Sequence, residues 1–256
     1  MLELNRIYNV DCVNGMKSLS DECIDLTITS PPYDNLRDYN GYSFDFENTA
    51  KELYRVSKPG ATIVWIVNDA TIEGSETGTS FKQALYFKKI GFNIHDTMIW
   101  EKPTFTATGA LRTRYGQVFE YMFIFTKGKI KTFNPIKDRK NKRAGEPIHG
   151  TVRQKDGSFR SVSAIGKPVA EYGQRFNIWQ ISPEKSSKNR FHPAQFPISL
   201  INDRVISWSN ENDLVLDPFM GSGTTALVCK SLNRSFIGFE ISEEYCKIAE
   251  ARLNEH

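Results

Sequence analysis

Hydrophobic and polar positions follow two patterns that alternate along the chain. Short apolar runs rich in β-branched and aromatic residues are separated by longer segments whose apolar residues recur every three or four positions. The first pattern is typical of buried strands and the second of amphipathic helices. The run ATIVWIV at residues 61–67 is apolar at almost every position, as expected of a strand covered on both faces. The sequence therefore predicts strands and helices in alternation.

The same pattern predicts where each element lies. We expect strands at residues 6–10, 25–29, 61–67, 92–100, 121–126, 214–216 and 235–239. We expect helices at residues 46–57, 79–90, 197–207, 222–232 and 242–253. Lys58-Pro59-Gly60 and Gly91 follow the first two helices, where proline and glycine end a helix. This order of elements predicts an α/β fold with an open, mostly parallel sheet.

One long segment breaks the alternation. Residues 135–173 are rich in Gly, Lys, Arg and Ser, and their apolar residues show no period. A connection of this length without regular structure is uncommon inside a compact domain, so we expect it to be functional. We predict an insert at residues 103–190, with a core strand near 120–126, between an N-terminal part at 1–102 and a C-terminal part at 191–256.

Charge separates this insert from the rest of the chain. The formal net charge is +3, but residues 127–190 hold 16 Lys and Arg against 5 Asp and Glu, whereas the remaining residues hold 17 against 25. A basic segment joined to an acidic body is typical of a surface that binds a polyanion. A solvated charged loop is the alternative, and charge alone does not decide between the two.

Several classes of protein do not fit the composition. No stretch approaches the roughly 18 apolar residues of a transmembrane helix, and the start, MLELNRIYNVDC, lacks the basic-then-apolar order of a signal peptide. Cys12, Cys23, Cys229 and Cys246 form no CxxC pair and have no His at ligand spacing. We therefore expect reduced thiols in a cytoplasmic protein, with no membrane segment, disulfide framework or metal site.

A glycine-rich turn joins a predicted strand to a predicted helix in the string LVLDPFMGSGTT at residues 214–225. Glycines at such a turn let the backbone approach a ligand that a Cβ atom would exclude. No Lys follows the second glycine, which excludes a P-loop. Gly221, Gly223 and Ala226 fit a loose dinucleotide pattern, with Glu240 at the end of the next strand. A nicotinamide-dependent oxidoreductase therefore stays open on this motif alone.

A second motif, Ser30-Pro31-Pro32-Tyr33, directly follows the strand predicted at residues 25–29. Two prolines fix the backbone and remove two donors, which leaves carbonyl groups as outward acceptors. A row of acceptors beside an aromatic ring suits a planar ligand with an exocyclic amino group. An ordinary proline turn is the alternative when this motif is taken by itself.

Together the two motifs make the chain resemble the amino-methylating DNA methyltransferases, which use S-adenosylmethionine. Ser-Pro-Pro-Tyr comes first and Asp-Pro-Phe-Met-Gly-Ser-Gly comes last, an order that resembles the circularly permuted β group of that family. The resemblance implies a Rossmann-like methyltransferase sheet. It also implies that the insert is the DNA-recognition region.

The resemblance assigns roles to the residues at matching positions. It implies catalysis by Ser30, Pro31, Pro32 and Tyr33, and binding of S-adenosylmethionine by Asp11, Cys12, Asp217, Pro218, Phe219, Gly221, Ser222, Gly223, Thr224, Thr225, Glu240 and Ile241. In this assignment Asp11 meets the adenine and Glu240 the ribose hydroxyls. The string HPAQFP at residues 192–197 resembles the motif that lines the methionine end, with Phe196 where many members carry Lys.

The implied reaction is direct methyl transfer to the amino group of a base. Ser30 Oγ and the Pro31 carbonyl would accept the amino hydrogens, which favours the positive charge that grows on nitrogen. The base has to leave the duplex, and Tyr33 would replace some of the lost stacking. In the family, Ser at the head of this turn accompanies cytosine far more often than adenine, where Asp or Asn is usual. We therefore expect transfer to cytosine N4, with adenine N6 as the alternative.

Double-stranded DNA is the partner that the resemblance implies, and a cognate restriction endonuclease is a candidate second partner. The basic cluster would then contact phosphates, through Lys127, Lys129, Lys131, Lys137, Arg139, Lys140, Lys142 and Arg143. An RNA or protein amine methylase and a non-catalytic DNA-binding subunit are rival functions, whereas an oxidoreductase lacks a proposed hydride-transfer residue. We expect a monomer or a homodimer.

Overall fold

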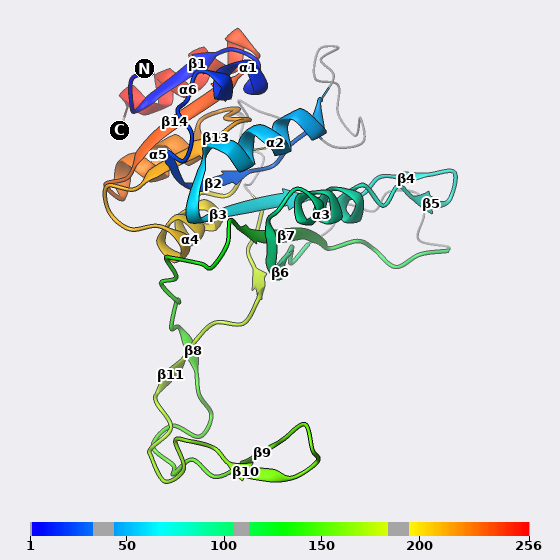
Figure 1. The fold of residues 1–256 in the computed structure, drawn as a ribbon, viewed down its shortest axis with the longest axis vertical. Helices are drawn as coiled ribbons and strands as arrows, with labels where there is room; N and C mark the ends of the chain where they lie inside the picture. The colour runs from blue at the N-terminus through cyan, green and yellow to red at the C-terminus, as the bar shows by residue number, and fades with distance from the viewer. Residues whose placement is uncertain (1, 33–43, 105–112, 184–194, 256) are drawn as a thin grey trace. The chain divides into compact units, whose positions relative to one another are not determined.

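The computed structural model describes residues 2–32, 44–104, 113–183 and 195–255. In these residues an eight-stranded sheet has the strand order β1-β14-β13-β2-β3-β7-β6-β12 (Figure 1). Its strands are β1 (Arg6–Asn9), β2 (Ile24–Thr29), β3 (Ser57–Val67), β6 (Asn93–Glu101), β7 (Phe119–Thr126), β12 (Ile178–Gln180), β13 (Leu214–Asp217) and β14 (Ser235–Glu240). The predicted Rossmann-like α/β fold is confirmed.

Strand directions set one functional edge of the sheet. Strands β1, β14, β13, β2 and β3 pair in parallel. Strand β7 runs antiparallel between β3 and β6. The C-terminal strands β13 and β14 therefore lie between the N-terminal strands β1 and β2, which is how the permuted motif order folds into one continuous sheet.

Six helices, among the described residues, cover this sheet. They are α1 (Cys12–Lys17), α2 (Phe46–Val56), α3 (Thr79–Lys89), α4 (Ile198–Trp208), α5 (Thr224–Ser231) and α6 (Glu243–Asn254). Helices α1, α2 and α3 pack in one row, and α4, α5 and α6 in another. Crossovers through the first row lead towards β6 and those through the second lead towards β1, so right-handed connections place the rows on opposite faces.

The core lies between the sheet and these helices. Trp65 of β3 is fully buried, and its Nε1 donates to Gln83 Oε1 at 2.8 Å. The rings of Phe87 and Phe125 stack with centroids 4.5 Å apart. Trp65 and Trp100 are core residues, as predicted from their apolar strands.

The predicted elements differ from the structure mainly at their boundaries. Helix α2 ends at Val56 and strand β3 begins at Ser57, because the segment predicted as a helix stop already pairs with the sheet. Helix α1 was not predicted; it has six residues and begins at the Asp11 cap. A small hairpin of β4 (Thr71–Ile72) and β5 (Ser75–Glu76) was also not predicted.

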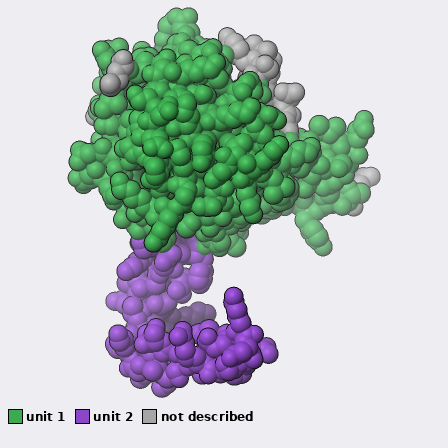
Figure 2. All heavy atoms as spheres, in the orientation of Figure 1, with its two compact units in different colours: residues 1–134, 177–256 green, residues 135–176 purple. Residues whose placement is uncertain are grey.

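The chain divides into two compact units (Figure 2). We call Met1–Asn134 with Asn177–His256 the sheet unit and Pro135–Phe176 the arm. The arm spans fewer residues than the insert predicted at residues 103–190, whose bounds stay a prediction. Strand β7 contains the core strand predicted near residues 120–126, and β12 pairs with β6 in the same sheet, where its Trp179 is buried.

The arm is built from two short antiparallel ribbons. One pairs β8 (Arg139–Lys140) with β11 (Tyr172–Gly173), and the other pairs β9 (Thr151–Arg153) with β10 (Phe159–Ser161). No residue from Pro135 to Phe176 is buried. The backbone ladder holds the arm together, since it has no hydrophobic core.

Two searches of the described residues set limits on the kind of protein. No helix among them is long and apolar enough to cross a membrane. No group of three or more His, Cys, Asp or Glu side chains in those same ranges is arranged to hold a metal ion.

Candidate active site

The carboxyl ends of four neighbouring parallel strands form the candidate site. Along β1, β14, β13 and β2 these ends place Asp11, Glu240, Asp217 and Ser30 in that order on one edge of the sheet. The chain turns in opposite directions after β13 and after β2. Such a switch point in an α/β sheet is where ligands bind.

Asp217 joins the two predicted motifs. Its Oδ1 accepts hydrogen bonds from Thr29 Oγ1 at 2.7 Å and from Phe219 N at 3.1 Å. Its Oδ2 accepts from Thr225 Oγ1 at 2.6 Å. The side chain is 2% exposed, and burial raises the pKa of its carboxyl to about 6, against the opposing effect of the two threonine hydroxyls. Asp217 therefore positions the end of β2 against the glycine turn.

The glycine turn requires glycine for backbone and packing reasons. Gly221 and Gly223 have φ values of 53° and 81°, in the left-handed region. A Cβ atom on Gly223 would lie 2.8 Å from Ala249 Cβ of α6. The turn therefore brings the backbone against α6 more closely than any larger residue permits.

Helix α5 begins at this turn with unused polar groups. Gly223 is its N-cap and offers no side-chain cap. The hydroxyl of Thr224 is buried and has no hydrogen-bond partner among the described residues. A buried polar atom without a partner is costly, and a helix N-terminus favours negative charge. This end of α5 therefore fits a polar, anionic part of a ligand.

The neighbouring serine has a structural partner. Arg252 of α6 donates through one Nη1 to the carbonyl oxygen of Ser222 and to its Oγ, the latter at 3.0 Å. Ser222 and Pro218 are both buried. Ser222 and Pro218 therefore belong to the buried part of the turn, and Arg252 links Ser222 to α6.

Glu240 and Asp11 are the acidic groups at the next two strand ends. Glu240 Oε2 accepts from Gly221 N and Oε1 from Ser242 N, both at 2.8 Å, and burial raises the pKa of its carboxyl. Asp11 Oδ1 accepts from Asn14 N at 3.0 Å as the cap of α1. Each carboxylate oxygen has two lone pairs, so both side chains retain acceptors for ligand hydroxyl or amino groups.

Asn9 fixes these strand ends, a role that the sequence did not reveal. Its Nδ2 donates to the carbonyl oxygens of Glu240 and Ile241, both at 2.9 Å. Ile241 is 37% exposed beside them.

Cys12 Sγ lies 3.5 Å from Thr49 Oγ1, and burial raises the pKa of its thiol to about 11. The thiol is therefore buried and neutral, and the predicted contact of Cys12 with a cofactor stays a prediction.

The Ser-Pro-Pro turn lies at the end of β2. Ser30 and Pro32 are half-buried and Pro31 is buried. Tyr33, the fourth predicted catalytic residue, lies outside the described residues. Phe219 of the glycine turn packs edge-on against Phe44, with ring centroids 5.3 Å apart. The structure therefore brings the two motifs to one edge of the sheet.

The predicted DNA-binding residues divide between the two units. Lys137, Arg139, Lys140, Lys142 and Arg143 belong to the arm, whereas Lys127, Lys129 and Lys131 belong to the sheet unit. Of the arm residues, Lys137, Lys140, Lys142 and Arg143 are exposed. Arg139 lies over the Phe176 ring at 4.4 Å, and Arg143 pairs with Glu146 at 2.6 Å.

Lys127 has internal partners, which speak against the predicted phosphate contact. Its Nζ donates to the carbonyl oxygens of Tyr54 and Ser57, both at 2.9 Å, and pairs with Glu22 at 3.1 Å. All three donors of the ammonium are therefore used within the sheet unit. We leave Lys127 out of the DNA-binding surface.

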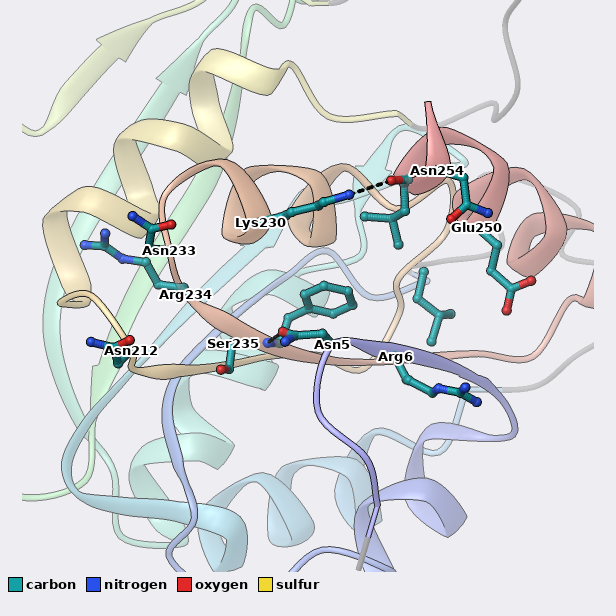
Figure 3. A pocket seen from close by; sticks show the side chains of 12 residues that line it. Asn5, Arg6, Asn212, Lys230, Asn233, Arg234, Ser235, Glu250 and Asn254 are labelled. Atoms are coloured by element: carbon teal, nitrogen blue, oxygen red, sulfur yellow. Dashed lines mark hydrogen bonds between the residues drawn. The ribbon is translucent and has the colours of Figure 1, made fainter. Parts of the chain in front are cut away.

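A separate cleft of about 670 Å³ lies at the amino-terminal ends of β1 and β14. Figure 3 shows Asn5, Arg6 and Ser235 around it, with Lys230 of α5 donating to the Leu253 carbonyl at 2.9 Å. Ligands of parallel α/β sheets bind at the carboxyl ends of the strands. This cleft is therefore at the opposite edge from the candidate site.

Comparisons with known proteins agree with this geometry. A family model described as DNA methylase matches residues 24–251. An orphan methyltransferase, M.BamHII of Bacillus amyloliquefaciens, is 53% identical over 247 residues, covering 94% of this chain and 92% of the relative. The type II methyltransferase M.HpaI of Haemophilus parainfluenzae is 32% identical over 262 residues, covering 97% of this chain and 74% of the relative.

Solved structures of methyltransferases share the fold. The complex of M1.HpyAVI with SAM has a TM-score of 0.68 at 26% identity and covers 97% of this chain and 98% of that one. The PvuII DNA methyltransferase, described as cytosine-N4-specific, has a TM-score of 0.69 at 20% identity and covers 96% of this chain and 85% of that one. At that identity the second likeness speaks for the fold alone.

Proposed function

The chain belongs to the DNA methylase family, and we propose that it methylates the exocyclic N4 of a cytosine flipped out of double-stranded DNA. S-adenosylmethionine is the methyl donor. Type II methyltransferases among the relatives support a role in restriction and modification. A cognate endonuclease, and the choice between monomer and homodimer, stay predictions.

The strand order supports a binding mode for the cofactor. Asp11, Glu240 and the glycine turn follow one another along the edge of the sheet, in the order of adenine, ribose and methionine. The unpartnered Thr224 hydroxyl and the N-terminus of α5 fit the carboxylate of the methionine part. Phe196 then needs no charge, because α5 supplies the complementary partial charge.

The turn after β2 supplies the catalytic contacts. S-adenosylmethionine, when bound, provides a methyl group on a positively charged sulfur. Ser30 Oγ and the Pro31 carbonyl oxygen each accept a hydrogen bond from the amino group of the base. These two bonds orient the nitrogen lone pair towards that methyl group. The same acceptors stabilise the positive charge that develops on nitrogen before a proton is lost. Asp217 acts indirectly, because its bond from Thr29 fixes the residue before Ser30.

The proposal of cytosine depends on Ser30, the neutral side chain at the head of this turn. A hydroxyl both donates and accepts hydrogen bonds, whereas a carboxylate only accepts. Cytosine and adenine both present an acceptor ring nitrogen next to the amino group, so Ser30 Oγ fits either edge, and the preference for cytosine rests on the resemblance of the motif. The cytosine-N4-specific PvuII enzyme shares the fold, and Ser at this position resembles the cytosine-specific members.

Nucleoside mass spectrometry tests the proposal. Purified protein, labelled S-adenosylmethionine and unmodified duplex DNA should yield label in N4-methylcytosine. Label in N6-methyladenine would contradict the choice of cytosine, and label in 5-methylcytosine would contradict amino-group transfer. DNA without any label would contradict the whole proposal.

Ser30→Ala tests the catalytic assignment. We expect kcat to fall by roughly 100-fold or more, as when one preorganised hydrogen-bond partner of a transition state is lost. Cofactor affinity, measured by calorimetry, should stay unchanged because Ser30 acts on the base. Ser231→Ala, at an exposed serine of α5, is the matched control and should keep full turnover. Equal kcat in the two variants would exclude this role for Ser30.

A further inference from the structure

The end of the arm is a preordered ribbon. Strands β9 and β10 pair antiparallel, and the connection between them is closed by Gln154 N donating to Ser158 O at 2.7 Å. Asp156 Oδ1 accepts from Ser158 N at 2.9 Å and from Ser158 Oγ at 2.7 Å. Gly157 has φ of 86°, the left-handed position that such a turn needs. The ribbon therefore keeps its shape without a core.

Its side chains face solvent although some are apolar. All six residues of β9 and β10 are exposed, and Phe159 is 69% exposed. No buried residue of the arm lies beneath this ring, so it does not pack in a core. An exposed aromatic ring among arginines is typical of a binding surface.

Charge indicates the partner of this surface. The arm, Pro135–Phe176, carries ten Lys and Arg against four Asp and Glu. A surplus of this size suits a polyanion. In a DNA methyltransferase that polyanion is the duplex, whose major groove, about 12 Å wide, admits a two-stranded ribbon.

The pairing register sorts the side chains onto two faces. Directly opposed residues of an antiparallel pair share a face. Arg153 lies opposite Phe159, and Thr151 opposite Ser161, so these four form the first face. Val152 lies opposite Arg160 on the second face.

The two faces differ in the chemistry that they offer. A guanidinium reads guanine O6 and N7, hydroxyls bond to several base edges, and an apolar ring contacts the thymine methyl group. The first face carries all three kinds of group. The second offers one cation beside one aliphatic side chain, which suits a phosphate contact.

We propose that the first face of the β9–β10 ribbon, made of Thr151, Arg153, Phe159 and Ser161, reads base edges in the major groove of the target DNA. Arg160 on the second face contacts phosphate. Lys140 and Lys142, at the other ribbon of the arm, add phosphate contacts without reading sequence. This inference rests on the DNA methyltransferase function proposed above.

Two matched arginine variants test it on the full-length protein. Each variant methylates a library of duplexes with randomised positions, and modification-sensitive sequencing reports the base preference at every position. Arg153→Ala should lower discrimination at one position, a guanine, by roughly 5- to 150-fold. Arg160→Ala, which differs only in its face, should keep every preference. It should lower affinity for all sequences and reduce the slope of log affinity against log salt by about 0.9.

A third variant and the wild-type protein distinguish a wrong ribbon assignment from a wrong proposed function. Phe159→Ala should weaken the preference for a thymine while the salt slope stays unchanged. Unaltered preferences in both Arg153→Ala and Phe159→Ala, with wild-type methylation intact, would overturn the ribbon assignment alone. A wild-type protein that methylates no duplex in the library would instead overturn the proposed function.

Discussion

The candidate active site and the arm show opposite ways of holding polar side chains. At the site, Asp217 is 2% exposed and accepts three hydrogen bonds from protein groups. In the arm, no residue from Pro135 to Phe176 is buried. Chemistry on a bound amine needs groups fixed by packing, whereas contact with a long polyanion needs groups that reach into solvent. The difference fits the proposed division of roles, with catalysis at the sheet edge and recognition of DNA in the arm.

The arm replaces packing with backbone pairing and local ion pairs. Arg175 N donates to the Ile136 carbonyl at 2.9 Å, which closes the base of the arm. Beside it the Arg175 guanidinium bonds to Asp138 and holds the pKa of that carboxyl below its usual range. Exposed pairs contribute little stability, so the arm opens more easily than the sheet unit.

Replacing the arm gives the largest expected effect. Because Ile136 and Arg175 are hydrogen-bonded neighbours, a short Gly-Ser linker can replace residues 137–174. We expect DNA affinity to fall by roughly 1000-fold or more, the gap between specific and non-specific binding. Cofactor affinity should stay unchanged. The thermal midpoint should move by less than about 2 °C, since a larger shift would require about 1 kcal/mol or more.

Calorimetry, filter binding and thermal denaturation measure these three quantities. A linker of equal length inserted after Gly74, in the exposed β4–β5 hairpin, is the control. It should leave DNA affinity at its wild-type value. Loss of cofactor binding together with the arm would show that the two regions are not separate in function.

The sequence predicts the sheet unit better than the arm for a physical reason. Strands such as 61–67 are buried on both faces and therefore consist of consecutive apolar residues. This pattern makes their position recognisable in the sequence. Strands β9 and β10 are short and fully exposed, and their pairing depends on backbone groups that leave no pattern of side chains. Helix α1 was not predicted because its six residues are too few to show a helical period, and Asp11 is its only side-chain cap.

The motifs of the site were predictable from the sequence, but the contacts that join them were not. Asp217 was assigned to the cofactor, yet its partner Thr29 is 188 positions away. Only the strand order, with β13 beside β2, brings the two together. The internal partners of Lys127 were not predictable for a similar reason, because Glu22 and the Ser57 carbonyl are distant in sequence.

Two glycines with nearly equal backbone angles sharpen the comparison. Gly223 has φ of 81° in the glycine turn, and Gly157 has φ of 86° in the arm. A Cβ atom would lie 2.8 Å from Ala249 Cβ at the first position and would meet nothing within 4 Å at the second. Gly157→Ala should therefore cost about 1–2 kcal/mol of local strain. Gly223→Ala should add roughly 1–3 kcal/mol of overpacking.

Denaturant unfolding and hydrogen exchange measure the two costs. Gly223→Ala should lower the free energy of unfolding of the whole sheet unit and weaken cofactor binding. Gly157→Ala should speed exchange only at amides of the arm and leave the global transition unchanged. An equal loss of global stability in the two variants would contradict the division between a packed site and an exposed arm.

Titration of one aspartate in each region gives effects of opposite sign that vary with pH. Burial raises the pKa of Asp217 to about 6 from 3.8, so between these values the folded state binds more protons than the unfolded state. The free energy of unfolding should therefore fall as the pH rises from about 4 to about 6, and stay low above that. Asp217→Asn removes this titration while keeping the shape. Its stability relative to the wild type should be greatest near pH 8 and decline towards pH 4, by at most about 3 kcal/mol.

Asp138 in the arm provides the opposite sign. Arg175 lowers its pKa, so its contribution is present above the ordinary carboxyl range and is lost as the pH falls through the lowered value. Asp138→Asn should therefore destabilise the arm at neutral pH and have no effect in acid. Solvent screens this exposed pair, so hydrogen exchange of the arm amides, followed from pH 7 down to pH 3, is the measurement that can resolve it. Stabilities that changed with pH in the same direction, measured by global unfolding for Asp217→Asn and by hydrogen exchange for Asp138→Asn, would show that burial does not distinguish the two carboxyl groups. Opposite slopes of stability against pH would instead show that the buried charge of Asp217 destabilises the sheet unit, whereas the exposed charge of Asp138 stabilises the arm.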